Sequence, residues 1–248
     1  MGQMPQSTGS LPTSSANESA TLRFTVGDLR IVHEVHAPAA PVTAADIVPA
    51  LQGVVNAVVD AAERNAVASG REISCRKGCG ACCRQLVPIS RSEGERLLAL
   101  VDAMPTGRRM RVKKRLEETA ALVERAGLGA ANGRSDREMS AAYFALGIAC
   151  PFLEDESCSI HADRPLVCRE YLVTSPASLC AGPAQEGVTP VPVPKLSLAA
   201  QRLQDERDSW FPLAMLMAWS RTPRPAQQRP ATEWVQRFLR RLSSASSR

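Results

Sequence analysis

The chain has 248 residues, of which 44% are hydrophobic, so it can bury a sizeable core without relying on disulfides. Its net charge is only +5 and its aromatic content is 4%, which argues against a protein that binds nucleic acid by charge or base stacking. The longest strongly apolar run, residues 210–219, is about half the ~20 residues that cross a bilayer. We therefore expect a cytoplasmic protein with no transmembrane segment and no clear nucleic-acid partner.

Residues 1–20 are rich in Ser, Thr, Gln and Gly and carry neither the basic nor the apolar region of a secretory signal, so we expect them to be disordered. Apolar and polar residues alternate over 21–26 and 29–35, on either side of Gly27-Asp28, which predicts a β-hairpin with a two-residue turn. His33 and His36 lack a paired ligand motif and are interpreted as surface or structural residues.

Apolar residues at helical spacing predict a helix from about residue 44 to 68, which Thr43 can cap and Gly70 ends. Beyond it, Ser90 followed by Glu93 is a capping box that starts a helix ending near residue 103.

A further helix is predicted over about 106–125. With the helix before it, this one is expected to form an antiparallel hairpin that returns Cys150 to the neighbourhood of Cys83. Six basic residues lie between 108 and 115, either as a patch for an anionic partner or as a solvated helix face on which lysines pair with Glu117 and Glu118. We favour the solvated face, since i,i+4 pairs are ordinary and contribute about 0.2–0.5 kcal/mol each.

In the second half, a short helix through residues 141–146 leads to Cys150, and Asp163 can cap a helix with Pro165 in its first turn. Cys168 would then lie near the positive end of the helix dipole, which favours the thiolate. Helices are also predicted at about 197–209 and 212–219.

The chain as a whole is expected to be mainly α (α+β), with an N-terminal hairpin followed by helices around a cysteine-rich metal or cluster site. Residues 1–20 would be a disordered N-terminus, 21–220 a metal-binding domain, and 221–248 a linker and an amphipathic C-terminal helix. That last helix can pack on the domain or bind a protein partner or a membrane surface, and packing is favoured.

Four of the eight cysteines fall within nine residues, and all eight lie between 75 and 180. Crowded thiolates repel one another unless a cation neutralises them or they oxidise in pairs. In a reducing compartment a metal site is the better interpretation than disulfides. The predicted metal ligands are Cys75, Cys79, Cys82, Cys83, Cys150, Cys158, Cys168 and Cys180.

The pattern C-x3-C-x2-C-C, then C-P-F-L, then C-x-I-H-x-x-R-P-x-x-C-R-x-Y, resembles the bacterial YkgJ-like family, also described as the CxxCxxCC zinc- or iron-chelating cysteine cluster. The resemblance runs roughly from Thr21 to Trp219, and its first spacing is x3 where the family label has x2. It implies a metal-binding cysteine cluster. Flagellin lysine methylases carry a similar cluster.

Several chemical alternatives stay open. The cofactor is zinc or iron, or an iron–sulfur cluster, and eight thiols suit two four-ligand sites or one binuclear or cluster site. Sequence does not decide whether the protein is a binding protein or an enzyme, either an iron–sulfur oxidoreductase or a methyltransferase-like protein. His161 can replace a cysteine, although an ordinary polar role is favoured. Compensating charge is expected from the neighbouring basic residues Arg76, Lys77, Arg84, Arg164 and Arg169.

Overall fold

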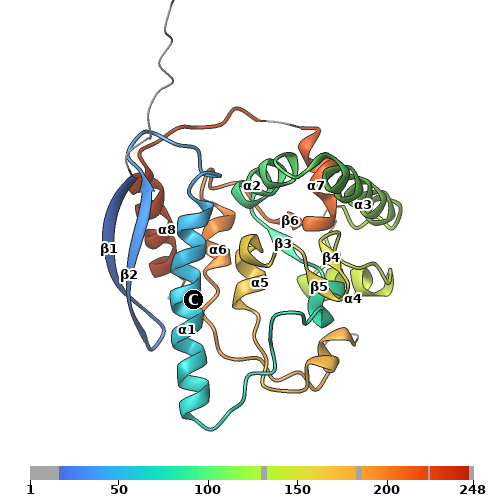
Figure 1. The fold of residues 1–248 in the computed structure, drawn as a ribbon, viewed down its shortest axis with the longest axis horizontal. Coiled ribbons are helices and arrows are strands. Elements are labelled where there is room, and N and C mark those ends of the chain that lie inside the picture. Colours follow the sequence, from blue (N-terminus) through green and yellow to red (C-terminus); the bar gives the residue numbers. More distant parts are fainter. Residues whose placement is uncertain (1–16, 130–132, 183–185, 223, 246–248) are drawn as a thin grey trace, which may run out of the picture.

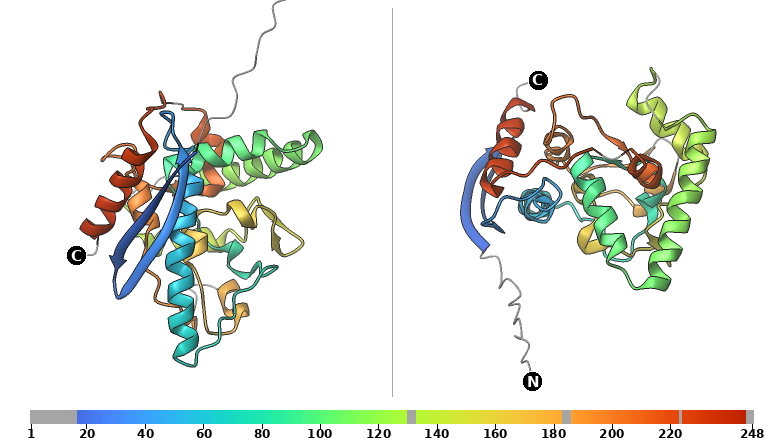
Figure 2. Two further views of the ribbon diagram at one scale, coloured as in Figure 1. Left: turned by 60° about the vertical axis from the view of Figure 1, so that its left-hand side comes forward. Right: turned by 90° about the horizontal axis from the view of Figure 1, so that it is seen from above.

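The computed structural model describes residues 17–129, 133–182, 186–222 and 224–245. The fold is mainly helical, with 48% helix and 14% strand, and begins with a β-hairpin followed by helices, which confirms the predicted class. The hairpin forms an outer layer, α1 (Val48–Ala68) and α8 (Ala231–Ala245) lie behind it, and α2 (Arg91–Asp102) and α3 (Thr106–Arg125) lie on the opposite side (Figure 1; Figure 2). Among the described helices, none is long and apolar enough to cross a membrane.

The hairpin pairs β1 (Asn17–Val26) with β2 (Leu29–Pro38) in antiparallel register, with Gly27-Asp28 as the turn. Residues 17–20 lack the apolar alternation that predicts a strand, yet they continue the pairing; residues 1–16 of the segment expected to be disordered lie outside the described residues. His33 packs against α1, where a Cβ on Gly53 would lie 2.9 Å from the His33 Nε2 atom.

Helix α1 begins at Val48, four positions later than the sequence predicts. The intervening residues form a turn in which the backbone N–H and hydroxyl of Thr43 both donate to the Asp46 carboxylate, at 2.9 and 2.7 Å. Pro49 lies in the first helical turn, where its missing N–H costs little. The buried stripe of α1 packs against β2 and α8 in the largest core cluster.

Both helices of the predicted helical hairpin are present, and α2 starts with the predicted capping box of Ser90 and Glu93. The basic residues of α3 largely contact the protein itself. Lys113 pairs with Asp102 of α2 at 2.7 Å, and Lys114 pairs with Glu118 at 3.8 Å. A second capping box, Ser135 with Glu138, starts α4 (Asp136–Ala145), five residues before the predicted start.

The predicted helices after residue 196 are much shorter in the structure. The first becomes α6 (Ser197–Gln201), and the second becomes β6 (Phe211–Pro212), a 3-10 turn and α7 (Leu216–Ser220). Strand β6 pairs with β3 (Pro88–Ile89), the segment that enters α2. Long-range contacts therefore determine the structure here in place of local helix propensity.

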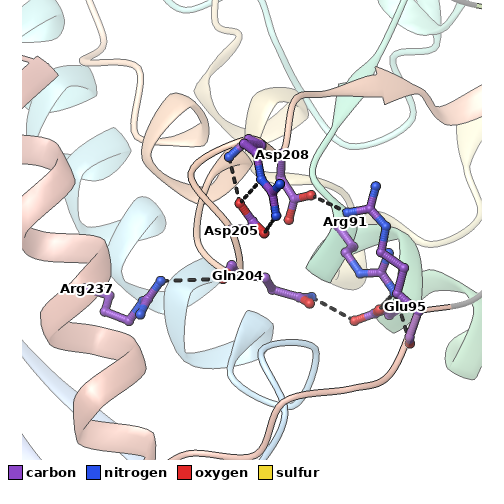
Figure 3. Close-up of polar contacts among 8 residues, drawn as sticks. Arg91, Glu95, Gln204, Asp205, Asp208 and Arg237 are labelled. Atoms are coloured by element: carbon purple, nitrogen blue, oxygen red, sulfur yellow. Dashed lines mark hydrogen bonds and ion pairs between the residues drawn. The ribbon is translucent and has the colours of Figure 1, made fainter.

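The loop after α6 connects the two sides of the molecule through polar contacts (Figure 3). The Gln204 side chain donates to Glu95 of α2 at 2.9 Å, and Arg237 of α8 donates to the backbone carbonyls of Leu203 and Gln204 at 3.2 and 3.5 Å. Residues 202–210 follow a path of bends and turns between these contacts, including a bond from the Asp208 N–H to the Asp205 carbonyl at 3.2 Å, where the sequence predicts a continued helix.

The apolar face of the C-terminal helix α8 is buried in the same core as α1 and the hairpin. Trp234 and Phe238 are fully buried, and the Trp234 indole N–H donates to the Val42 carbonyl at 2.9 Å. The C-terminal helix therefore packs on the rest of the protein, which is the alternative that the sequence analysis favours.

Candidate metal centre

The first cysteine segment leaves α1 and turns back on itself. The Ser74 N–H donates to the Val173 carbonyl at 2.9 Å, which fixes where the segment begins, and the Cys79 N–H donates to the Arg76 carbonyl at 3.1 Å. Gly78 lies at φ +88°, a left-handed conformation that glycine adopts without strain. A 3-10 turn over Ala81–Arg84 then carries Cys82 and Cys83.

We call the first cysteine segment, residues 75–84, the knuckle. Gly80 lets the knuckle lie directly on a small hairpin formed by β4 (Leu153–Glu154) and β5 (Ser157–Cys158). A Cβ at Gly80 would lie 2.6 Å from the Glu156 carbonyl oxygen. The Arg84 guanidinium secures the contact, donating to both carboxylate oxygens of Glu156 at 3.0 and 2.7 Å. Glu156 itself has φ 54°, a strained value for a side chain of this size.

The second cysteine region returns to the first through the backbone. The Cys150 N–H donates to the Cys83 carbonyl at 2.7 Å, so the two regions are adjacent, as predicted for the helical hairpin between them. Cys168 lies in α5 (Leu166–Glu170), which Pro165 precedes. The prediction that Asp163 caps this helix is wrong, because Asp163 lies in a separate 3-10 turn and the Leu166 N–H donates to Glu93 instead, at 2.8 Å.

Seven of the eight predicted ligands line a single cavity of about 280 Å³: Cys75, Cys79, Cys82, Cys83, Cys150, Cys158 and Cys168. They come from the knuckle, the segment around β5, and α5, so residues as distant in sequence as Cys79 and Cys168 line the same cavity. Cys82 and Cys83 are adjacent in the chain, and both line the cavity from the 3-10 turn that carries them. All eight cysteines are free thiols.

The eighth cysteine, Cys180, lies beside this cavity instead of lining it. It is buried, at 3% exposure, with its sulfur 3.9 Å from the Tyr171 hydroxyl, and Tyr171 does line the cavity. The Gln85 side chain, just after the knuckle, donates to the Cys180 carbonyl at 3.0 Å.

The thiols share a cavity without converging on one point. Among the described residues, no three His, Cys, Asp or Glu side chains form a ready set of metal ligands. Metal sites are commonly completed only when the ion binds, so the test of fit is the donor chemistry. Seven thiols around one cavity are a donor set suited to soft metals such as zinc or iron.

The electrostatics of the cavity oppose free thiolates. Burial raises the pKa of Cys150 to about 12, and burial together with neighbouring cysteines raises the pKa of Cys168. A hydrogen bond with Cys83, followed by burial, raises the pKa of Cys82. A thiolate at Cys82 would also raise the pKa of five other thiols, so the cysteines oppose one another's ionisation: Cys75, Cys150, Cys158, Cys168 and Cys180.

Among the basic residues expected to supply compensating charge, the structure distinguishes different roles. Arg164 lines the cavity, and its charge offsets part of the rise in the pKa of Cys82, Cys158 and Cys168. Arg169 offsets part of the rise in the pKa of Cys158 as well, and it also holds the fold, donating to the Arg164 carbonyl and to Asn56 of α1, both at 2.9 Å.

Other groups at the cavity have mixed charge. Arg76, Lys77 and His161 line it together with the acidic Asp60 and Glu63 of α1. Burial, then Arg164, lowers the pKa of His161, which favours the neutral imidazole that a metal ligand requires.

Residues 74–187 match a family model, CxxCxxCC, described as "Putative zinc- or iron-chelating domain". The match spans slightly less than half of the chain and includes all eight cysteines. It supports binding of zinc or iron by this segment. Neither the curated proteins nor the solved structures contain a match to the chain.

Proposed function

We propose that the segment matched by the zinc- or iron-chelating family model binds zinc or iron through its cysteines in a centre with more than one metal ion. The observation that carries this proposal is the single cavity lined by seven thiols from separate parts of the sequence. Its volume of about 280 Å³ exceeds what one tetrahedral ion with metal–sulfur bonds of about 2.3 Å requires. In this proposal Cys180, beside the cavity, is the outermost of the eight ligands.

A bound cation would reverse the electrostatics of the cavity. It would lower the pKa of each ligating thiol, and the protons would leave with binding. Arg164 would offset part of the negative charge that several thiolates bring. When iron is bound with sulfide, the same thiols would hold an iron–sulfur cluster. The metal would serve structure, storage, transfer or electron transport.

The enzyme alternative, an iron–sulfur oxidoreductase or a methyltransferase-like protein, is a separate hypothesis. A catalytic metal keeps a coordination position open to small molecules, whereas a structural zinc site is closed by four protein ligands. With this number of thiols we favour closed sites and therefore a binding protein.

Elemental analysis and absorption spectra of anaerobically purified protein test the proposal. We expect either a colourless sample with stoichiometric zinc, or a brown sample with iron and broad absorption at the violet end of the visible spectrum. Thiol alkylation followed by mass spectrometry then identifies the protected cysteines. The proposal fails if the protein contains no stoichiometric metal, does not take up added Zn²⁺ or Fe²⁺, and leaves all its thiols reactive.

A further inference from the structure

The buried carboxylate of Glu93 joins the starts of two helices. Its Oε2 atom accepts from the Ser90 N–H at 2.8 Å and from the Ser90 hydroxyl at 2.7 Å, which completes the capping box of α2. Its Oε1 atom accepts from the Leu166 N–H at 2.8 Å. Leu166 is the first residue of α5, so a side chain of α2 supplies the cap that α5 itself lacks.

The third hydrogen bond reaches the metal-binding region. Glu93 lies ten positions after Cys83 in the sequence, and Leu166 lies two before Cys168. The bond therefore connects the chain leaving the first cysteine segment to the short helix that carries Cys168. Glu93 is 3% exposed, so water does not substitute for it as an acceptor.

Helix α5 has other polar attachments. Gln52 of α1 donates to the carbonyls of Asp163 and Arg164 just before the helix, at 3.3 and 3.2 Å, whereas Glu93 accepts from the first N–H of the helix itself. Its last residue, Glu170, accepts from the N–H and the hydroxyl of Ser197 in α6, at 2.6 and 2.7 Å. Arg169 attaches it to Asn56 of α1. A helix of five residues has little stability of its own, so such contacts decide where Cys168 lies.

We propose that Glu93 is a positioning residue for the metal centre: it holds the N-terminus of α5 so that Cys168 faces the cysteine cavity. The inference rests on the proposed function. All three neighbours of the carboxylate donate hydrogen bonds, so an amide of the same shape would turn an N–H₂ group toward at least one donor.

A matched pair of variants tests this role. Glu93→Gln changes the buried capping box, whereas Glu138→Gln changes the capping box of α4, which has the same two bonds from Ser135, at 2.8 and 2.7 Å, but is exposed. We expect Glu93→Gln to weaken Zn²⁺ binding about 10- to 100-fold, the range typical of residues that orient metal ligands. Glu138→Gln should leave Zn²⁺ binding unchanged.

Two further measurements separate positioning from a general loss of stability. Val123→Ala removes apolar volume from a core cluster that contains no cysteine, and it should lower the unfolding temperature without weakening Zn²⁺ binding. In the reduced, metal-free protein, iodoacetamide should modify Cys168 several-fold faster in Glu93→Gln than in Glu138→Gln.

Equal Cys168 reactivity in the two glutamine variants would overturn the inference, as would an equal loss of Zn²⁺ affinity in Glu93→Gln and Val123→Ala. A wild-type protein that binds neither zinc nor iron would instead overturn the proposed function. The metal-free alkylation would still measure the position of Cys168 in that case.

Discussion

Cys82 lines the cysteine cavity from the 3-10 turn of the knuckle, whereas Cys180 is buried beside the cavity and does not line it. Cys82 and Cys180 should therefore contribute differently to Zn²⁺ affinity. We expect Cys82→Ser to reduce Zn²⁺ affinity about 100-fold or more, beyond the 10- to 100-fold effect of outer-shell residues. Cys180→Ser should have a smaller effect. Chelator competition measures both affinities, and equal effects would contradict a centre whose main ligands are the thiols that line the cavity.

Alanine substitutions at Gly80 and Gly107 should have opposite effects on stability. Gly80→Ala would place a Cβ 2.6 Å from the Glu156 carbonyl and 2.7 Å from Leu153, so the knuckle and the β4–β5 hairpin must separate. We expect a loss of about 1–3 kcal/mol in the free energy of unfolding, measured with denaturant, and weaker metal binding. Gly107→Ala is the control, because its Cβ would meet only Arg111 Nη1, at 3.6 Å, and alanine favours the helix. An unchanged Gly80→Ala protein would show that the knuckle contact is not needed.

The sequence predicts individual residues well where the signal is local. The cysteine spacing identifies a set of thiols of which seven share a cavity, and the Ser90–Glu93 spacing predicts a capping box. It does not reveal the bond from Leu166 to Glu93, because the two residues are 73 positions apart. The separate place of Cys180 is equally hidden, since it depends on how the 3-10 turn that contains it, Ala177–Ala181, packs against the 3-10 turn of the knuckle.

At the scale of elements, a helix with a capping box, such as α2, or with a long apolar stripe, such as α3, is predictable from the sequence. The region after residue 196 was not, because its apolar residues are consistent with a helix while its structure is fixed by Glu95, Arg237 and the pairing with β3 (Figure 3). Partners so distant in sequence leave no periodic signal.

Helix α8 provides a test at this scale. Phe238 is fully buried in the core that contains α1 and the hairpin, so Phe238→Ala should lower the free energy of unfolding by about 3–5 kcal/mol. Below its unfolding temperature the variant should keep its metal stoichiometry, since α8 does not line the cysteine cavity. Denaturant titration and elemental analysis measure the two effects. A change under about 0.5 kcal/mol, typical of a surface position, would argue that α8 does not depend on the core for its place.

For the whole molecule, the metal centre and the fold should be coupled, because the cavity joins segments from α1, the knuckle, β5 and α5. Structural zinc contributes apparent free energies of about 10–16 kcal/mol in small domains. We therefore expect metal removal by a chelator to lower the unfolding temperature markedly, and Cys168→Ser to lower both metal content and stability. His33→Ala, in the hairpin, should keep its metal. Calorimetry with elemental analysis would contradict the coupling if Cys168→Ser matched the wild type in both.

The backbone hydrogen bond from the Cys150 N–H to the Cys83 carbonyl has a consequence for how the protein is made. A ribosome synthesises the four thiols of the knuckle first, and 66 further residues must follow Cys83 before Cys150 appears. In the proposed metal protein, the early thiols would form an incomplete site throughout that interval, able to bind a metal ion loosely or to be oxidised. Full metal loading would therefore wait until α5 has been synthesised and folded against α1 and α2. Protection of the nascent thiols would then be part of the maturation of this chain.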